Sequence, residues 1–381
     1  MTGRSPAVAA DATRARRRRD RRGPRSGMRL RIAVVAAGLE IVGGQSVQAR
    51  ALTDGLRSDG YDVVFIPINR PFPTGLRWLR RYRYVRTVLN QSLYLQSLLR
   101  LRGADVVHIF SASYWSFVLA PVPAILAARA LGKRTVLHYH SGEAETHLAH
   151  WGHLVHPWLR LADELVVPSD YLRAAFAHHG YHARVIPNVV DASRFRYRER
   201  SPLRPRLLST RNLESYYRVD NTLEAFALVR ARHREATLTI AGSGSEEPRL
   251  RRLAASLGSH GIRFVGRVEP AAMADLCEQA DIFVNSSVVD NQPVSVLEAF
   301  AAGLPVVSTP TGDLAALVRD GDTGLIVPAG DPPAMAKAVV SLLDHPECAQ
   351  RMARRAHGTV EAYSWPRVRE QWAAVYSGAT A

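Results

Sequence analysis

Cysteine is scarce in this sequence of 381 residues, which contains only Cys277 and Cys348. So few cysteines exclude a disulfide scaffold and a zinc cluster held by thiolates, and they favour a reducing compartment. Long apolar segments are missing too. No run of about 18 uncharged apolar residues occurs, so we expect no transmembrane helix. The longest candidate, residues 115–128, is interrupted by Pro121 and Pro123.

Lysine is nearly absent as well, with only Lys133 and Lys337 among the 50 basic residues. Arginine therefore supplies almost all of the positive charge in a formal net charge of +16. Residues 1–27 contain nine arginines and two aspartates, a net of +7, which leaves +9 for the rest of the chain. The basic tail and the basic body need separate explanations.

The tail has almost no large apolar residues, so it buries too little surface to fold and we expect it to be disordered. Its role is open between an arm for nucleic acid or anionic lipid, a solvated extension without a specific role, and a stretch that is not translated because initiation occurs at Met28. A signal peptide is disfavoured. The apolar run that follows is short and leads into a glycine turn and a helix, not into a cleavage site.

Short apolar runs alternate with segments of helical period from Met28 onward. The first series of runs spans residues 32–37, 63–67, 106–110, 134–140 and 164–168, and the second spans 206–210, 237–243, 262–266, 281–285, 305–309 and 324–328. Runs that are apolar throughout are typical of parallel strands covered on both faces. We therefore predict an α/β fold of two doubly wound, Rossmann-like domains, with ligands in the cleft between them.

The expected organisation follows from these two series. A disordered tail (1–27) precedes an N-terminal domain (28–193), a linker rich in proline and arginine (194–206), a C-terminal domain (207–360) and a terminal helical segment (361–381).

The most informative stretch is DNQPVSVLEAFAAGLPVVST, residues 290–309. Pro293 suits a first helical turn, and the backbone amides of Val294 and Ser295 at the positive end of that helix favour a phosphate. Asp290 lies just outside the helix and Glu298 about one turn inside. Two carboxylates beside an anion site suit a ligand rich in hydroxyls. The alternative is an N-capping aspartate and a surface glutamate.

This stretch resembles the donor-site motif of retaining glycosyltransferases of the GT-B fold, the large family that includes sucrose and glycogen synthases and bacterial group 1 glycosyl transferases. That motif has two glutamates separated by seven residues; here the first is Asp290 and the second is Glu298. The resemblance covers most of residues 29–377. It implies that Glu298 holds the ribose of a nucleotide sugar, that Asp290 lies near the donor sugar, and that the last helix crosses back to the N-terminal domain.

Further site residues are implied by the same resemblance. Gly43 and Gly44 match the family's first glycine loop, and Arg211 matches an arginine that neutralises the donor diphosphate. The family's lysine falls on Tyr217, so Arg218 next to it is either a second phosphate ligand or a plain solvated residue. Arg267 and Val268 match the segment that contacts the nucleobase.

His140 follows a predicted strand and matches a family histidine that faces the donor sugar. We expect His138 to point elsewhere. We expect no metal site and no cofactor besides the nucleotide-sugar substrate. Asp320 and Asp322 form an Asp-x-Asp pair only in a loop, and the histidines lack a zinc-binding spacing.

The basic body has one visible focus, LRWLRRYRYVR at residues 76–86, with arginines from Arg77 to Arg86. It is either a helix that lies on an anionic membrane or a solvated helix whose aromatic residues pack inward. The expected location is the cytoplasm, at the inner face of the membrane if this helix binds it.

The predicted function is a retaining, metal-independent glycosyltransferase that moves a sugar from a nucleotide-diphosphate donor to an acceptor hydroxyl of a glycan, glycolipid or lipid-linked precursor. His140, Asp290 and Glu298 are the expected catalytic residues, and the diphosphate ligands are Gly44, Arg211, Arg218, Val294 and Ser295. Two alternatives stay open: a nucleotide-sugar epimerase or hydrolase, and an inactive basic protein that binds membrane or nucleic acid. The second is weakened because no nucleic-acid-binding module is recognisable.

Overall fold

The computed structural model describes residues 30–39, 43–70, 72, 75, 78, 81–258 and 260–379. The expected disordered tail, residues 1–27, lies outside them. Residues 76, 77, 79 and 80 of the basic segment also lie outside the described part.

The N-terminal half is built on a parallel sheet of six strands in the order β2-β1-β3-β4-β5-β6. The strands are β1 (Arg31–Ala36), β2 (Asp62–Pro67), β3 (Val106–Ser111), β4 (Arg134–Tyr139), β5 (Glu164–Val167) and β6 (Arg184–Val185). The helices are α2 (Gly44–Ser58), α3 (Arg83–Ser97), α4 (Trp115–Leu119), α5 (Pro121–Ala130), α6 (Ala144–Leu159) and α7 (Asp170–His178), with short 3₁₀ turns η2 (Leu98–Gly103) and η3 (Ala192–Arg194).

The C-terminal half repeats the plan in the order β12-β11-β10-β7-β8-β9, again with all neighbours parallel. Its strands are β7 (Arg206–Ser209), β8 (Thr237–Ala241), β9 (Ile262–Gly266), β10 (Ile282–Asn285), β11 (Val306–Ser308) and β12 (Leu325–Ile326). Its helices are α8 (Val219–Arg232), α9 (Glu247–Ser256), α10 (Pro270–Gln279), α11 (Val294–Ala301), α12 (Leu314–Leu317), α13 (Pro332–Asp344), α14 (Pro346–Thr359) and α15 (Trp365–Ser377), with η4 (Ser215–Tyr217) and η5 (Val360–Tyr363).

Both faces of each sheet are covered by helices, as continuous apolar strands require. In β1, Ile32 and Val34 face a core shared with α2 and α15, while Ala33 and Val35 face the core beneath α3, α5, α6 and α7. In the second sheet, the neighbouring residues Leu207 and Leu208 of β7 likewise pack into two different cores, one on each face. This arrangement confirms the predicted α/β class with two doubly wound sheets.

Each sheet has one point where the strand order reverses. The chain leaves β1 toward β2 on one side and returns to β3 on the other, and β7 likewise lies between β8 and β10. Helices at such a point lie on opposite faces, so a crevice opens beyond the carboxyl ends of the strands. The topology therefore places two crevices, one in each half.

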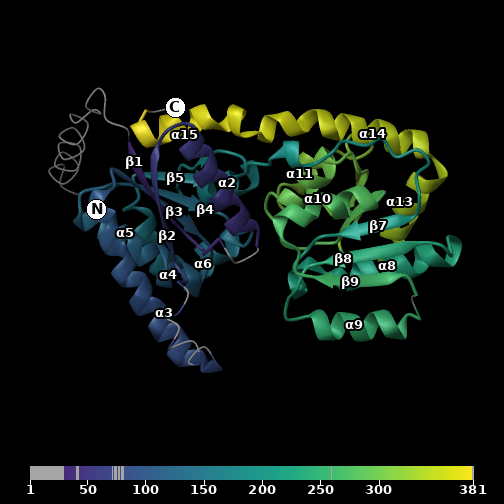
Figure 1. Cartoon of the computed structure of the whole chain (residues 1–381), viewed down its shortest axis with the longest axis horizontal. Coiled ribbons are helices and arrows are strands. Elements are labelled where there is room, and N and C mark those ends of the chain that lie inside the picture. Colours follow the sequence, from purple (N-terminus) through teal and green to yellow (C-terminus); the bar gives the residue numbers. More distant parts are fainter. Residues whose placement is uncertain are drawn as a thin grey trace, which may run out of the picture.

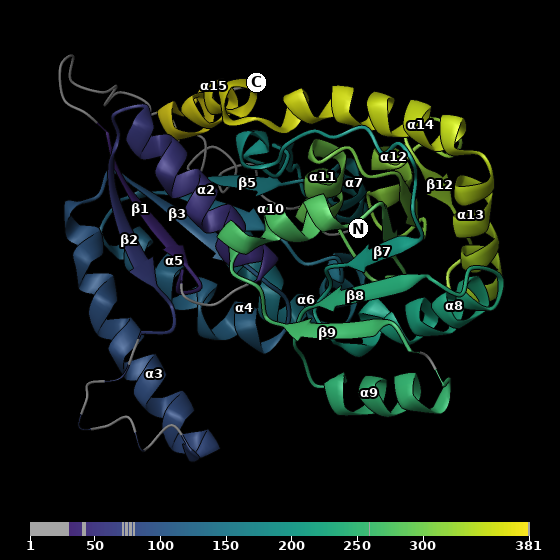
Figure 2. The same cartoon turned by 45° about the vertical axis from the view of Figure 1, so that its right-hand side comes forward.

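The last two helices join the halves. Figures 1 and 2 show α14 and α15 following one another along the same edge of the molecule, so that α15 lies on the N-terminal half. There Val368, Trp372, Val375 and Tyr376 share a core with Ile32 and Val34 of β1. The C-terminal helix α15 therefore forms part of the hydrophobic core of the N-terminal half.

The chain crosses between the halves at two closely spaced points. Val189 packs in the N-terminal core and the next residue, Val190, packs in the C-terminal core. On the return, Val360 packs in the C-terminal core and Val368 in the N-terminal core. The Val190 amide donates to the Tyr363 carbonyl over 2.9 Å, which ties the two crossings together.

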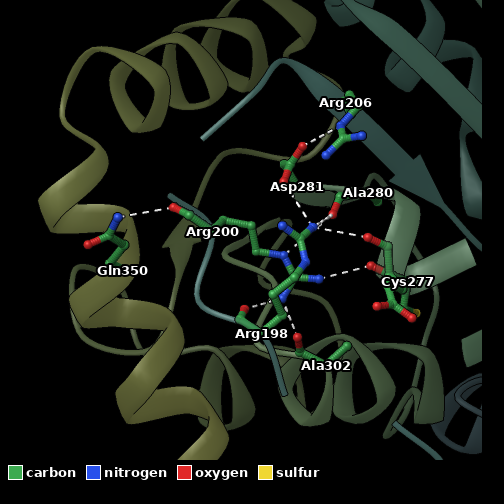
Figure 3. A network of polar contacts seen from close by, with 9 residues as sticks. Arg198, Arg200, Arg206, Cys277, Ala280, Asp281, Ala302 and Gln350 are labelled. Carbon is green, nitrogen blue, oxygen red and sulfur yellow. Dashed lines mark hydrogen bonds and ion pairs between the residues drawn. The ribbon is translucent and has the colours of Figure 1, made fainter. Parts of the chain in front are cut away.

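Residues 194–206, which the sequence suggests as a linker, are fastened to the C-terminal half. Figure 3 shows the Arg200 guanidinium among backbone carbonyls, with bonds of 2.6 Å to Arg198 and 2.9 Å to Cys277 and a further bond to Ala302. The fully buried Asp281 pairs with Arg198 at 3.2 Å and with Arg206 at 2.5 Å. The narrow connection between the halves therefore lies before this segment, at Val189 and Val190.

Candidate functional site

A cavity of about 450 Å³ lies between the two halves. It is lined by the loops that follow β1, β4, β7, β8, β9 and β10 and by the first turn of α11. These are the carboxyl ends of strands in both sheets, so the cavity joins the two crevices that the topology creates.

Nine of the ten expected site residues line this cavity. They are Gly44, His140, Arg211, Arg267, Val268, Asp290, Val294, Ser295 and Glu298. Gly44 is the first residue of α2, and a Cβ added there would meet no protein atom within 4 Å, so its backbone is not packed against a neighbour on that side.

Arg218 is the exception among the expected residues. It lies in the left-handed region at φ 47°, and its guanidinium bonds Asp220 at 3.0 Å and Asn221 at 2.9 Å. It is not among the described residues that line the cavity, whereas Tyr217 is. The local turn therefore directs Arg218 toward the start of α8, and the expectation that it reaches the diphosphate gains no support from this geometry.

Arg211 is the main positive charge in the cavity. Its guanidinium pairs with Asp290, donates to Ser295 Oγ over 3.1 Å and lies 4.2 Å from the ring centroid of Tyr217. The Arg211 side chain is 9% exposed and Asp290 10%. A buried guanidinium held on three sides keeps one orientation, so its free donors can face a bound anion.

The N-terminus of α11 adjoins this arginine. The helix begins at Val294, and Pro293 is its N-cap and not a first-turn residue, with no capping side chain in the described structure. The amides of Val294 and Ser295 lie at the cavity. The positive end of the helix dipole and the Arg211 guanidinium therefore favour an anion at the same place.

Glu298 lies one turn further along α11 and also lines the cavity. Burial raises the pKa of its carboxyl to about 7, against a smaller opposing effect of Arg194. Burial penalises the charged form, so a proton is held at a pH where an exposed glutamate has lost it. The ionised group is a strong acceptor for hydroxyls.

His140 belongs to a buried aromatic group. Its ring stacks on Phe110 with centroids 5.0 Å apart and lies 4.0 Å from the ring of His138. The expectation that His138 points elsewhere is wrong, because residues two apart in a strand share a face. Burial lowers the pKa of His140 to about 3, so its ring is neutral near pH 7.

The group continues to the C-terminal helix. His138 Nδ1 lies 3.2 Å from His108 Nε2, and His108 Nδ1 lies 2.8 Å from the Tyr376 hydroxyl of α15. Sequence reasoning missed His108. The signal was a histidine in the apolar run 106–110, which becomes informative only when β3 and β4 are known to pair.

Asn291 and Gln292, two further residues that the sequence analysis missed, join the halves at the cavity. The Ser169 hydroxyl donates to Asn291 Oδ1 over 2.5 Å, and the backbone N–H of Asn188 donates to Gln292 Oε1 over 2.7 Å. Gly142 lets the two backbones approach, since a Cβ there would lie 2.5 Å from the Asp290 carbonyl oxygen. Asn291 and Gln292, inside the motif at 290–309, thus position the halves.

Asp320 and Asp322, the loop pair considered for a metal, serve local structure. Asp320 Oδ1 accepts from the Ile326 amide over 2.9 Å, and Asp322 pairs with Arg355 at 2.7 Å. Within the described residues, no helix is long and apolar enough to cross a membrane.

Comparisons with known proteins identify relatives of both halves of the chain. A family model described as "Glycosyl transferases group 1" matches residues 204–345, and one described as "Glycosyltransferase Family 4" matches residues 42–194. A glycogen synthase of Mycobacterium tuberculosis is 33% identical over 294 residues, which cover 72% of this chain and 69% of that protein.

Solved structures show the same architecture. A sucrose-phosphate synthase of Thermosynechococcus elongatus has a TM-score of 0.74 at 19% identity, over 92% of this chain and 99% of that one. Anabaena HepE in complex with UDP and glucose has a TM-score of 0.70 at 16% identity, over 92% and 100% of the two chains. These likenesses confirm the predicted GT-B fold.

Proposed function

The chain belongs to the group 1 glycosyltransferases, and from this premise we propose that it moves a sugar from a nucleotide-diphosphate donor to an acceptor hydroxyl, with retention at the anomeric carbon and without a metal ion. The observation that carries the proposal is the meeting of Arg211, the α11 N-terminus and Glu298 in one cavity. This is an anion site beside a hydroxyl acceptor, as a nucleotide sugar requires.

Each residue has a distinct task in this proposal. Arg211 and the amides of Val294 and Ser295 neutralise the charge that develops on the leaving diphosphate. Glu298 accepts hydrogen bonds from the ribose hydroxyls, while Arg267 and Val268 contact the base. His140, neutral and turned to the cavity, faces the donor sugar.

Asp290 acts first through its ion pair, because it fixes the guanidinium of Arg211 beside Ser295. Its remaining acceptor capacity faces the donor sugar. The acceptor hydroxyl attacks from the side of the departing phosphate, which takes the proton. No step in this scheme needs a metal, because a guanidinium and a helix terminus supply the positive charge.

The test is a panel of UDP-, GDP- and ADP-sugars with EDTA, with nucleotide release and thermal stabilisation as readouts. Anabaena HepE is in complex with UDP, so UDP-sugars come first. Arg211→Met and Glu298→Ala should each lose stabilisation by the donor, while Glu235→Gln, a 68% exposed control, should keep it. A protein that responds to none of the donors yet binds DNA or vesicles would be an inactive binding protein.

Product analysis separates transfer from the other enzymatic alternatives. A hydrolase releases free sugar at the rate of nucleotide release, whether acceptor is present or not, and an epimerase converts the donor without releasing nucleotide. Faster nucleotide release when glycan or lipid acceptors are added supports transfer. No acceleration by any acceptor class would leave hydrolysis as the activity.

We further propose that the acceptor is presented at an anionic membrane. Tyr84, Val88 and Trp115 are 82%, 64% and 63% exposed, and we call them the α3 surface. Gln91 of α3 donates to the Leu119 carbonyl of α4 over 2.8 Å, which joins the helices that carry it. Figures 1 and 2 show α3 extending away from the body of the molecule.

The chemistry around this surface suits a bilayer. Arg81 and Arg86 are exposed beside the aromatic residues, and such a combination inserts rings at the headgroup level while arginines meet lipid phosphates. Tyr84→Ser with Val88→Ser should weaken binding to vesicles containing anionic lipid. Leu228→Ser, at a 48% exposed leucine on α8, is the matched control and should bind as the parent protein does.

A further inference from the structure

Three side chains outside the cavity come together between α6 and α7. The ligand atoms of Glu145, His178 and His179 all lie within 4.8 Å of one another. His178 Nδ1 is 2.8 Å and His179 Nε2 is 3.3 Å from the same oxygen, Glu145 Oε1. None of the three is among the described residues that line the cavity, so this group is separate from the proposed donor site.

Two imidazole nitrogens converge on one carboxylate oxygen here. His179 Nε2 is buried and has no hydrogen bond with a described residue, although Glu145 Oε1 is close. Burying a ring nitrogen without a hydrogen bond lowers the stability of the folded protein. Glu145 Oε1 already has a hydrogen bond with His178 Nδ1. A cation between the three groups satisfies His179 Nε2 as well, since neutral imidazole and carboxylate each offer a lone pair.

The end of α7 favours a positive charge at this point. His178 is the last residue of α7 and His179 is its C-cap, so both lie at the negative end of the helix dipole. Glu145 lies in the first turn of α6, which fixes the carboxylate at the start of a long helix. The three ligands thus come from two rigid elements and not from a loose loop.

We propose that Glu145, His178 and His179 bind a zinc-class divalent ion, which clamps the start of α6 to the end of α7. Two nitrogens and one carboxylate oxygen are the ligand types of Zn²⁺, Co²⁺ and Ni²⁺, whereas Mg²⁺ and Ca²⁺ take oxygen ligands. Three protein ligands leave a position for water or a fourth ligand.

The clamp lies next to the active cavity without entering it. Residues 140–143, which line the cavity, lead directly into α6, and the Tyr171 hydroxyl of α7 donates to the Gly142 carbonyl over 3.2 Å. An ion that joins α6 to α7 therefore stiffens the two helices that support this loop. Because the ion does not touch the donor site, its presence and the glycosyl transfer are tested separately.

The experiment uses untagged full-length protein, stripped with a chelator and titrated with Zn²⁺ by calorimetry and with Co²⁺ by visible absorption. We expect one ion per chain and a Co²⁺ spectrum typical of nitrogen and oxygen ligands. Glu145→Gln and His178→Gln should each weaken Zn²⁺ binding at least tenfold. Both side chains are substantially exposed, at 45% and 74%, so the variants should fold.

His153→Gln is the matched control, because His153 is an exposed histidine on α6 outside the group. It should bind Zn²⁺ as the parent protein does. Absence of stoichiometric binding, as expected if His178 and Glu145 form only a hydrogen-bonded pair, would overturn the proposal. So would binding that both variants leave unchanged, or Mg²⁺ competing equally with Zn²⁺.

Discussion

At the scale of single residues, Glu298 is the clearest case of a side chain whose pKa is changed by burial. Its carboxyl holds a proton to about pH 7, because burial raises its pKa to about 7. In the proposed donor site its task is to accept hydrogen bonds from hydroxyls, and the ionised form does this best. The protonation of Glu298 and donor affinity should therefore be linked.

We predict that kcat/KM for the donor rises as the pH increases from about 6 to 8 in the parent protein, as Glu298 ionises. Glu298→Gln should flatten this rise, and at pH 8 it should lower kcat/KM about 10- to 100-fold, the equivalent of one hydrogen bond to a charged group. Initial rates at low donor concentration across this pH range measure both effects. An unchanged pH profile in Glu298→Gln would show that another group controls it.

At the scale of elements, β3, β4 and α15 are joined by His108, His138 and Tyr376. Burial lowers the pKa of His108 to about 3 and that of His138 well below its usual value. Nearby His140 shares this behaviour. All three are neutral in the native protein at pH values where the unfolded chain binds protons.

The free energy of unfolding should therefore fall as the pH drops below about 6.5 toward 3, since the unfolded state then binds more protons than the native state. Each histidine contributes up to about 1.4 kcal/mol per pH unit within this window. Glu298 acts in the opposite direction between its ordinary pKa of 4.5 and about 7, because its native form keeps a proton there. The combined effect of the three histidines on the free energy of unfolding is larger than the opposite effect of Glu298.

Urea denaturation at pH 5 and pH 7 measures this loss. His138→Asn, which cannot take up a proton but keeps polar atoms toward His108, should reduce the difference between the two pH values. His153→Gln, at an exposed position, should leave it unchanged. Equal acid sensitivity in His138→Asn and the parent protein would contradict this account.

The segment 194–206 is a second case at the scale of elements. Arg200 is 2% exposed and donates to backbone carbonyls of Cys277 and Ala302, as Figure 3 shows. We predict that Arg200→Met destabilises the protein by about 3 kcal/mol, because several buried carbonyls lose a charged donor. Thermal and urea unfolding measure the change.

Arg204→Met is the control for this prediction, since Arg204 lies in the same segment but is exposed. Its stability should stay within about 0.5 kcal/mol of the parent protein. If Arg200→Met also changed the free energy of unfolding by only about 0.5 kcal/mol, the carbonyls of Cys277 and Ala302 would be accepting hydrogen bonds from other donors.

At the scale of the whole molecule, the two halves are joined by two chain crossings, at Val189–Val190 and between Val360 and Val368, and by a set of polar contacts across the cavity. Few residues join the halves covalently, so we expect these contacts to influence how far the cavity is closed. Gln292 is prominent among them because its side chain accepts from the backbone N–H of Asn188 and donates to Asp313 over 3.1 Å.

We predict that Gln292→Ala shifts the molecule toward open arrangements. Loss of about 1 kcal/mol of contact between the halves lowers the ratio of closed to open molecules about fivefold. The KM for the donor should rise by a similar factor, and small-angle scattering should give a larger radius of gyration. An unchanged radius of gyration together with an unchanged KM would show that Gln292 does not hold the halves together.

Much of the site could be predicted from the sequence because its residues are local to single loops. Arg211, Asp290, Ser295 and Glu298 each follow a recognisable strand or begin a recognisable helix, and strand order then brings their loops to one edge. Arg218 could not be placed, since its direction depends on one left-handed residue in a short turn. His108, Asn291 and Gln292 were missed because their roles lie in contacts with residues distant along the chain.

The sequence by itself determined the class of the fold and the two parallel sheets, and through its resemblance to a known family it indicated the candidate residues of the donor site. Those features follow from apolar runs, helix starts and a motif at 290–309, which act over short stretches of chain. The tertiary structure alone decided where the halves join, that residues 194–206 are fixed to the C-terminal half, and that Glu298 holds a proton near pH 7. The physical reason is that burial, pKa values and long-range hydrogen bonds depend on what packs around a residue, and its sequence neighbours do not specify that.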